Sequence, residues 1–195
     1  SIDVYDLVLE GLDEAVYREI AKALVAMVED NAFNAYNKTS GQTFDEAEFD
    51  RLLATADAYG QSTIYCTFEF AATMEPANNG MWSDNMKDEK WNNGYFTRYK
   101  RHNVIVLPQS FEDTTNAKKV IDPSYAWIIP TGAEKPVKIA FEGQTAVREH
   151  ENADWSREIQ TYKKLGVAVY NTNPGICVYK NKSLSINNTA GTWGN

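Results

Sequence analysis

The sequence predicts an α+β fold in one domain, and three observations lead to this prediction. Helical periodicity occupies most of the first half of the chain, β-strand patterns occupy most of the rest, and the two do not alternate. The chain has 195 residues, which is the length of one domain. Hydrophobic residues make up 43% and charged residues 24%, values that are typical of a globular protein and exclude disorder throughout.

The longest predicted element is a helix over residues 3–33. Apolar side chains recur there at steps of three and four residues, and no proline interrupts them. At 1.5 Å per residue such a helix is about 45 Å long. Because a domain of this size needs less, we expect this helix to be a spine against which other parts pack.

A loop and a second helix follow the long helix. Residues 37–42 combine Asn, Ser and Gly, which predicts a loop. Thr43–Glu46 fits a capping box, with the Thr43 hydroxyl as the cap. We expect the helix that begins there to end at Gly60 and to bury one side, made of Phe49, Leu52, Leu53 and Ala56.

Shorter elements make up the remainder. We expect helices at 68–74, stopping at Pro76, and at 84–91, capped by Ser83 and ending at Gly94. Strands are predicted at 63–66, 95–99, 103–107, 126–129, 137–141, 145–149, 157–164 continuing into 166–170, and 176–179, the last of which closes the sheet. Residues 187–195 are predicted to be a frayed tail.

Charge is distributed unevenly along the chain. Nineteen basic and 27 acidic residues give a net charge of −8. Residues 1–60 carry −9 and residues 61–195 carry +1. The acidity therefore belongs to the helical front, as solvated helix faces or as a surface that does not stick to nucleic acid. It excludes a simple nucleic-acid binder, which needs an excess of Lys and Arg.

Searches for a membrane segment, a disulfide framework and a metal site find none of them. No apolar run is long enough to span a membrane, and no signal peptide opens the chain. Cys66 and Cys177 are the only cysteines, and each lies in a predicted apolar strand, which favours buried free thiols. Residues 30–34 do not match the spacing of a calcium loop. The sequence predicts no metal and no cofactor.

The sequence also predicts no catalytic residue. His102, beside Arg101, and His150, in an acidic turn, are the only histidines, and we expect both at the surface. The acids Glu149, Glu151, Asp154 and Glu158 near Trp155 leave open a carboxylate-based hydrolase or carbohydrate-active enzyme. Acids and aromatic residues at this density are common, so we expect a protein that is not an enzyme.

Several blocks of residues resemble one known family. The chain resembles the major capsid proteins of tailed phages and prophages that have the Hong Kong 97 fold. The resemblance is carried by Met81–Glu89, Gly94–Phe96, Val104–Phe111, Tyr125–Pro130, Lys135–Gly143 and Asp154–Val169. It covers most of the chain and is weaker before Ile64.

This resemblance implies a division of the chain. Residues 1–43 correspond to the spine helix of the peripheral (P) domain, 44–134 to the axial (A) domain, 135–183 to returning P-domain strands and 184–195 to a tail. The family places an N-terminal arm and an extended hairpin, the E-loop, before the spine. Because this chain begins at Ser1, at the spine and without an initiator Met, we expect a trimmed chain that lacks both parts.

The function implied by the resemblance is structural. It is that of a subunit of an icosahedral capsid shell, which self-assembles from hexamers and pentamers and encloses DNA without sequence-specific binding. Scaffold, portal and cement proteins are further expected partners, and a membrane is not. The expected location is the virion, after assembly in the cytoplasm of a bacterial host. An encapsulin-like nanocompartment shell remains an alternative.

Overall fold

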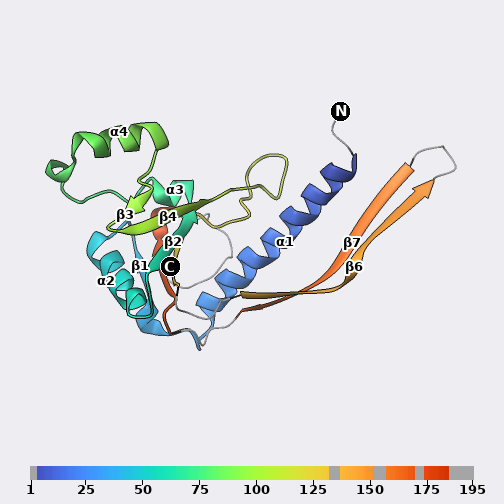
Figure 1. Ribbon diagram of the computed structural model, residues 1–195, viewed down its shortest axis with the longest axis horizontal. Helices are drawn as coiled ribbons and strands as arrows, with labels where there is room; N and C mark the ends of the chain where they lie inside the picture. Colours follow the sequence, from blue (N-terminus) through green and yellow to red (C-terminus); the bar gives the residue numbers. More distant parts are fainter. Residues whose placement is uncertain (1–3, 132–136, 152–156, 170–173, 185–195) are drawn as a thin grey trace.

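The computed structural model describes residues 4–131, 137–151, 157–169 and 174–184, and it is a mixed α+β structure (Figure 1). A six-stranded sheet with the order β1-β8-β5-β2-β4-β3 forms the centre, and β6 and β7 form a separate ribbon. The β1/β8 and β2/β4 pairs are parallel, and the other pairs are antiparallel. The six strands are β1 Lys38–Gly41, β2 Ser62–Thr67, β3 Arg98–Tyr99, β4 His102–Leu107, β5 Tyr125–Pro130 and β8 Cys177–Asn181.

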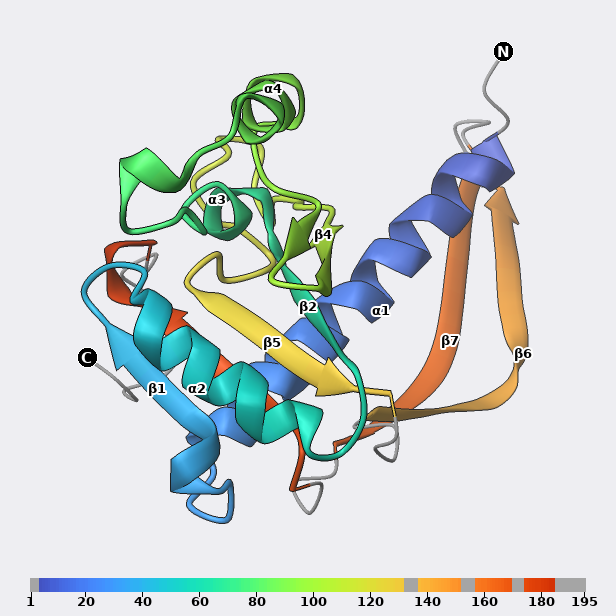
Figure 2. The same cartoon turned by 60° about the vertical axis from the view of Figure 1, so that its left-hand side comes forward.

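The predicted long helix is present as α1, Val4–Glu29. Its C-terminal part lies on one face of the sheet, and its other end extends past the sheet beside β7 (Figure 2). It ends before residue 33 because the Asp30 carboxylate accepts a hydrogen bond from the backbone N–H of Ala32 at 2.8 Å, which turns the chain. Asn34 then caps a short 3₁₀ helix, Ala35–Asn37.

The other face of the sheet carries α2, Glu46–Asp57. The predicted cap at Thr43 is wrong, because the carboxylate of Asp45 accepts the first free N–H groups of the helix. Tyr179 explains the shift, since its hydroxyl donates to the Thr43 carbonyl at 2.7 Å and accepts from the Asp45 N–H at 3.0 Å. The predicted apolar side of the helix is confirmed as buried, at Phe49, Leu52, Leu53 and Ala56.

Several strand predictions need correction. Lys38–Gly41, predicted as part of a loop, is β1, which pairs with β8. β8 does not close the sheet but lies between β1 and β5. The strand predicted at 95–99 is reduced to Arg98–Tyr99. The errors at β1 and β8 concern pairing between segments that are distant in sequence, which local patterns do not report.

The remaining elements largely follow the predicted positions. Helix α3 covers Phe68–Ala71, and α4 covers Asp84–Asn93 with Ser83 as its cap and Gly94 in the left-handed conformation (φ 77°) after its end. Two further 3₁₀ turns lie at Asn79–Met81 and Lys182–Leu184.

The ribbon consists of β6, Val137–Glu151, and β7, Arg157–Val169. β6 joins the two strands predicted at 137–141 and 145–149, with a register shift between Glu142 and Ala146. An isolated two-stranded ribbon is at best marginally stable in water, and here it lies beside α1. The predicted tail, 187–195, lies outside the described residues.

Candidate functional site

The turn between β3 and β4 has an unusual backbone. Tyr99 pairs with His102, which leaves Lys100 and Arg101 as a two-residue turn with φ angles of 42° and 73°. Tight hairpins require such angles, but glycine, asparagine and aspartate adopt them most easily. A non-glycine residue in this region stores about 1–3 kcal/mol of strain. The surrounding contacts must therefore hold the turn in place.

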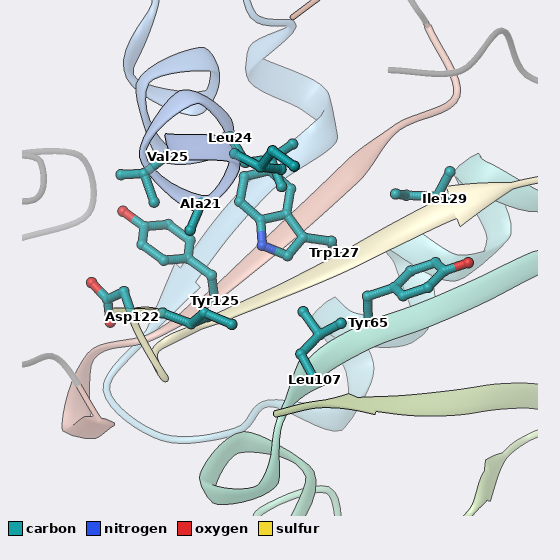
Figure 3. Close-up of a pocket in the computed structure, with 11 residues that line it drawn as sticks. Ala21, Leu24, Val25, Tyr65, Leu107, Asp122, Tyr125, Trp127 and Ile129 are labelled. Carbon is teal, nitrogen blue, oxygen red and sulfur yellow. The ribbon is translucent and has the colours of Figure 1, made fainter. Parts of the chain in front are cut away.

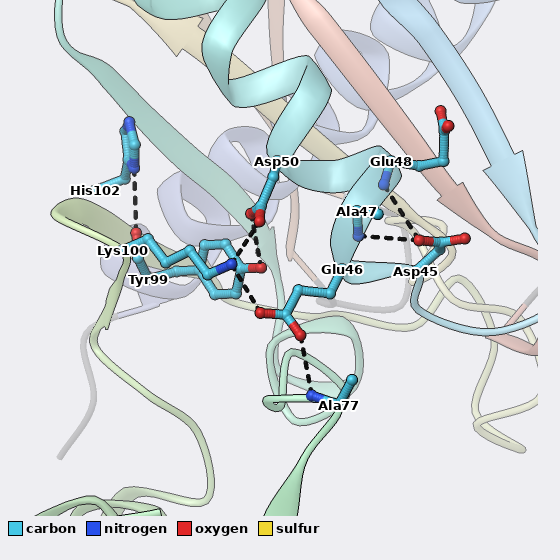
Figure 4. Close-up of polar contacts among 9 residues, drawn as sticks. All are labelled: Asp45, Glu46, Ala47, Glu48, Asp50, Ala77, Tyr99, Lys100 and His102. Atoms are coloured by element: carbon cyan, nitrogen blue, oxygen red, sulfur yellow. Dashed lines mark hydrogen bonds and ion pairs between the residues drawn. The ribbon is translucent and has the colours of Figure 1, made fainter. Parts of the chain in front are cut away.

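Helix α2 holds the turn through ionic contacts (Figure 4). The Lys100 ammonium lies 2.7 Å from Glu46 Oε1 and 2.5 Å from Asp50 Oδ2. The Tyr99 hydroxyl donates to Asp50 Oδ1 at 3.0 Å. The hydrogen bond from Lys100, helped by the N–H of Ala77, lowers the pKa of Glu46. Burial, with Asp50 nearby, raises the pKa of Tyr99, so this phenol stays a donor.

His102 lies directly after the turn and is buried, so the predicted surface position is wrong. Its Nε2 lies 2.8 Å from Asp57 Oδ2, and its Nδ1 lies 3.2 Å from the carbonyl oxygen of Tyr99. Both ring nitrogens thus face acceptors, and only the protonated imidazole can donate to both. The Ser62 hydroxyl also donates to Asp57 Oδ1, at 2.7 Å.

The Asp57 carboxylate joins the end of α2 to the start of two strands. Burial raises its pKa, but the hydrogen bonds from Ser62 and His102 outweigh burial, so the pKa of Asp57 lies below its usual value. The carboxylate is therefore held ionised at neutral pH. Sequence reasoning missed this group because Asp57 and His102 are 45 residues apart and no motif surrounds either of them.

A polar depression opens beside this group. It has a volume of about 590 Å³ and is lined by Asp57, Gln61, Arg98, Arg101 and His102. One Arg98 N–H donates to the Arg101 carbonyl at 3.1 Å. Within the described ranges, no acidic side chain contacts either guanidinium. Two arginines around a polar depression can bind an oxyanion such as a carboxylate or phosphate.

A second, apolar cavity lies between α1 and the sheet (Figure 3). Its volume is about 200 Å³. Ala21, Leu24 and Val25 of α1 face Tyr65 and Trp127 of the sheet across it. Its lining is mainly apolar, with the Asp122 carboxylate at one side. The cavity shows that α1 covers its face of the sheet incompletely.

The other residues singled out from the sequence do not form a site. Cys66 and Cys177 are buried free thiols, as predicted, and burial raises the pKa of each to about 12. In the part of the chain that the structure describes, no cluster of His, Cys, Asp and Glu is arranged to hold a metal ion. Within the same ranges no helix is long and apolar enough to cross a bilayer.

The candidate carboxylates of a hydrolase lie on the ribbon. Glu149 pairs with Ile159, and Glu158 pairs with His150. Because directly paired residues share a face and neighbours alternate, the Glu149 and Glu158 positions belong to opposite faces of the ribbon. Asp154 and Trp155 lie outside the described residues.

Comparisons with known proteins place the chain among phage-derived proteins. Residues 8–176 match the family model described as "SPbeta prophage-derived putative capsid protein YonB". No curated protein matches the chain. The crystal structure of a phage-related protein from Bordetella bronchiseptica RB50 is similar in fold, with a TM-score of 0.59 and 9% sequence identity over 95% of this chain and 68% of that one. Because the family model spans most of the chain, the chain belongs to the YonB family.

Proposed function

We propose that the chain is a structural subunit of a prophage capsid shell that assembles from copies of itself and encloses DNA. The match of residues 8–176 to a prophage-derived capsid family carries this proposal. The fold similarity to a phage-related protein supports it independently of sequence, because only 9% of residues are identical.

The arrangement of the elements fits a Hong Kong 97-type subunit. In this proposal α1 is the spine helix, and the β6–β7 ribbon beside it forms the P domain. The six-stranded sheet with α2 and α4 corresponds to the A domain. β1 and β8 pair within this sheet, so the proposed A domain also takes in residues 38–41 and 177–181.

The proposed partners follow from this role. Hexamers and pentamers of the chain form the shell, and scaffold, portal and cement proteins act with it. Packaged DNA is enclosed without sequence-specific binding, which fits a net charge of −8. The subunit catalyses no reaction, assembles in the host cytoplasm and ends in the virion.

Electron microscopy of the protein, expressed in its full natural length with and without a scaffold, tests the proposal. We expect uniform closed shells. Shells that retain a specific protein cargo instead of accepting DNA favour a nanocompartment. Monomers under every condition contradict the proposal, and a carbohydrate-hydrolysis screen of Glu149→Gln and Glu158→Gln variants then tests the hydrolase alternative.

A further inference from the structure

Helix α4 is attached to the rest of the molecule by one face, and among the described residues its opposite face makes no hydrogen bond or ion pair to another helix or strand. Lys90 donates to the Ala72 carbonyl at 2.6 Å and pairs with Glu75, and Glu89 accepts from the N–H of Thr97 at 2.8 Å. No residue of the helix is buried. In Figures 1 and 2 it lies at the outer end of the molecule, away from the sheet.

The opposite face of α4 is acidic and aromatic. Asp84, Asp88 and Trp91 are spaced four and three residues apart, which places them on one side of the helix. Trp91 is 90% exposed. Asp84 pairs with Lys87, whereas no basic side chain within the described ranges contacts Asp88. An exposed tryptophan of this kind is typical of an anchor residue at an interface.

The β3–β4 turn presents the complementary chemistry. Lys100 has a structural purpose there, because it holds the turn to α2. The Arg101 side chain makes no ion pair in the described part of this chain. Glycine or asparagine would adopt its φ of 73° at lower cost. The Arg101 carbonyl accepts from Arg98, but its guanidinium has no ion pair in the described residues, and a strained residue with a free charged side chain points to a ligand outside the chain.

We propose that Asp88 and Trp91 of one copy dock into the Arg98–Arg101 depression of a neighbouring copy. The Asp88 carboxylate pairs with a guanidinium, and the Trp91 indole stacks on one. The α4 surface and the depression are different surfaces, so the contact is head-to-tail, the type of contact that forms a ring when its rotation closes. The inference rests on the proposed shell function and names one contact within it.

The charge distribution favours a second copy over DNA as the occupant. A surface that binds the DNA backbone needs a series of Lys and Arg side chains, whereas the lining of this depression contains two arginines and the Asp57 carboxylate. The depression places two guanidinium groups beside an Asp57 carboxylate already paired with His102. A single carboxylate and an indole match this small basic site.

Disulfide trapping tests the contact without requiring a shell. Asp84→Cys and Gln61→Cys proteins, which keep Asp88, Trp91 and both arginines, are mixed and oxidised with copper-phenanthroline, and Cys66 and Cys177 are too buried to interfere. We expect a covalent heterodimer for this pair. The control pairs Asp84→Cys with Lys118→Cys, which places the second thiol on an exposed loop, and it should give none. Equal trapping in both pairs, or none in either, overturns the inference.

Charge exchange tests the same contact in shells. Arg98→Glu with Arg101→Glu should abolish assembly, Asp88→Arg in the same chain should restore part of it, and Lys118→Glu should leave it unchanged.

Shells that form normally with both arginines reversed overturn the contact but leave the shell function standing. Trapped heterodimers from a protein that forms no shells overturn the shell function alone. Loss of DNA retention with normal assembly assigns the depression to phosphate and overturns the inference.

The strained turn gives an additional readout. Arg101→Asn relieves the backbone strain, so Tm should rise by about 2 °C or more while assembly weakens. A purely structural role for Arg101 predicts the opposite, a fall in Tm with unchanged assembly, and that result overturns the inference.

Discussion

The two faces of the six-stranded sheet are covered by helices in different ways. On one face, α2 buries Phe49, Leu52 and Ala56 completely, and these pack with aromatic rings from the sheet and its connections. On the other face, Met27 and Val28 are the buried residues of α1 among those whose burial the structure describes, and both lie at its C-terminal end. The cavity of about 200 Å³ lies beside this second contact.

Polar contacts increase the difference between the faces. α2 is tied to the β3–β4 turn through Glu46, Asp50 and Asp57. α1 is linked to β1 by the Lys38 ammonium, which donates to the Val28 carbonyl at 2.8 Å, and to a loop by the ion pair of Arg18 with Glu112 at 3.7 Å. The α2 face is thus tied by a cluster of ion pairs at the β3–β4 turn, whereas the α1 face has a cavity beside its contact with the sheet.

The largest expected effect comes from Phe49→Ala. Phe49 is fully buried, and its ring lies 5.3 Å from that of Tyr99 and 5.8 Å from that of Tyr179, centroid to centroid. Removing it leaves a cavity that surrounding rings cannot fill, so the free energy of unfolding should fall by about 3–5 kcal/mol. Urea denaturation followed by circular dichroism measures this change.

Met27→Ala on the α1 face is the matched comparison. Met27 is 4% exposed, but the neighbouring Leu24 and Val25 line an existing cavity and can move into the space. The loss should be about 2 kcal/mol, at the lower end of the range for such substitutions. Equal losses for Phe49→Ala and Met27→Ala contradict the difference between the faces.

Local patterns predict the elements whose ends and faces are set by nearby residues. The apolar period of α1, the buried side of α2 and the Ser83 and Gly94 limits of α4 all belong to this class. Thr43 and Asp45 are both good caps, and the choice between them depends on Tyr179, which lies far along the chain. β1 depends in the same way on pairing with β8.

The candidate site is harder to predict from the sequence than the secondary structure is. Lys100 and Arg101 do not resemble an Asn-Gly hairpin turn, and the ionic contacts that permit the turn come from α2. His102 was expected at the surface because its partner, Asp57, is 45 residues away. The sequence contains the spacing of Asp84, Asp88 and Trp91, but it does not show that these side chains are exposed to solvent. Only the structure shows that the other side of α4 faces the molecule.

Asp57→Asn tests the polar attachment of the α2 face. The substitution weakens the bonds to Ser62 and His102, so the free energy of unfolding at pH 7 should fall by about 1–3 kcal/mol. The pKa of Asp57 is lowered in the folded state, so its contribution is complete above the unfolded value of about 4 and is lost as the pH falls through the folded value. The difference in the free energy of unfolding between the wild type and Asp57→Asn should therefore disappear at acid pH.

Denaturation curves at neutral and acid pH measure this difference. Asp88→Asn is the control, because Asp88 is exposed and contacts no basic side chain in the described ranges, so its effect on the free energy of unfolding should be small. A difference for Asp57→Asn that stays constant below about pH 4 would show that the ionised carboxylate is not what stabilises the α2 attachment.

The smallest expected effect comes from filling the cavity under α1. Ala21→Leu places added methyl groups where Ala21 faces Tyr65 and Trp127, and leucine is nearly as good a helix former as alanine. The free energy of unfolding should rise by about 1 kcal/mol, whereas Ala26→Leu, on the exposed side of the same helix, should give no gain. If Ala21→Leu destabilises the protein, α1 already packs as tightly as α2. If it stabilises the monomer and also slows shell assembly, the space under α1 is what lets the helix move against the sheet.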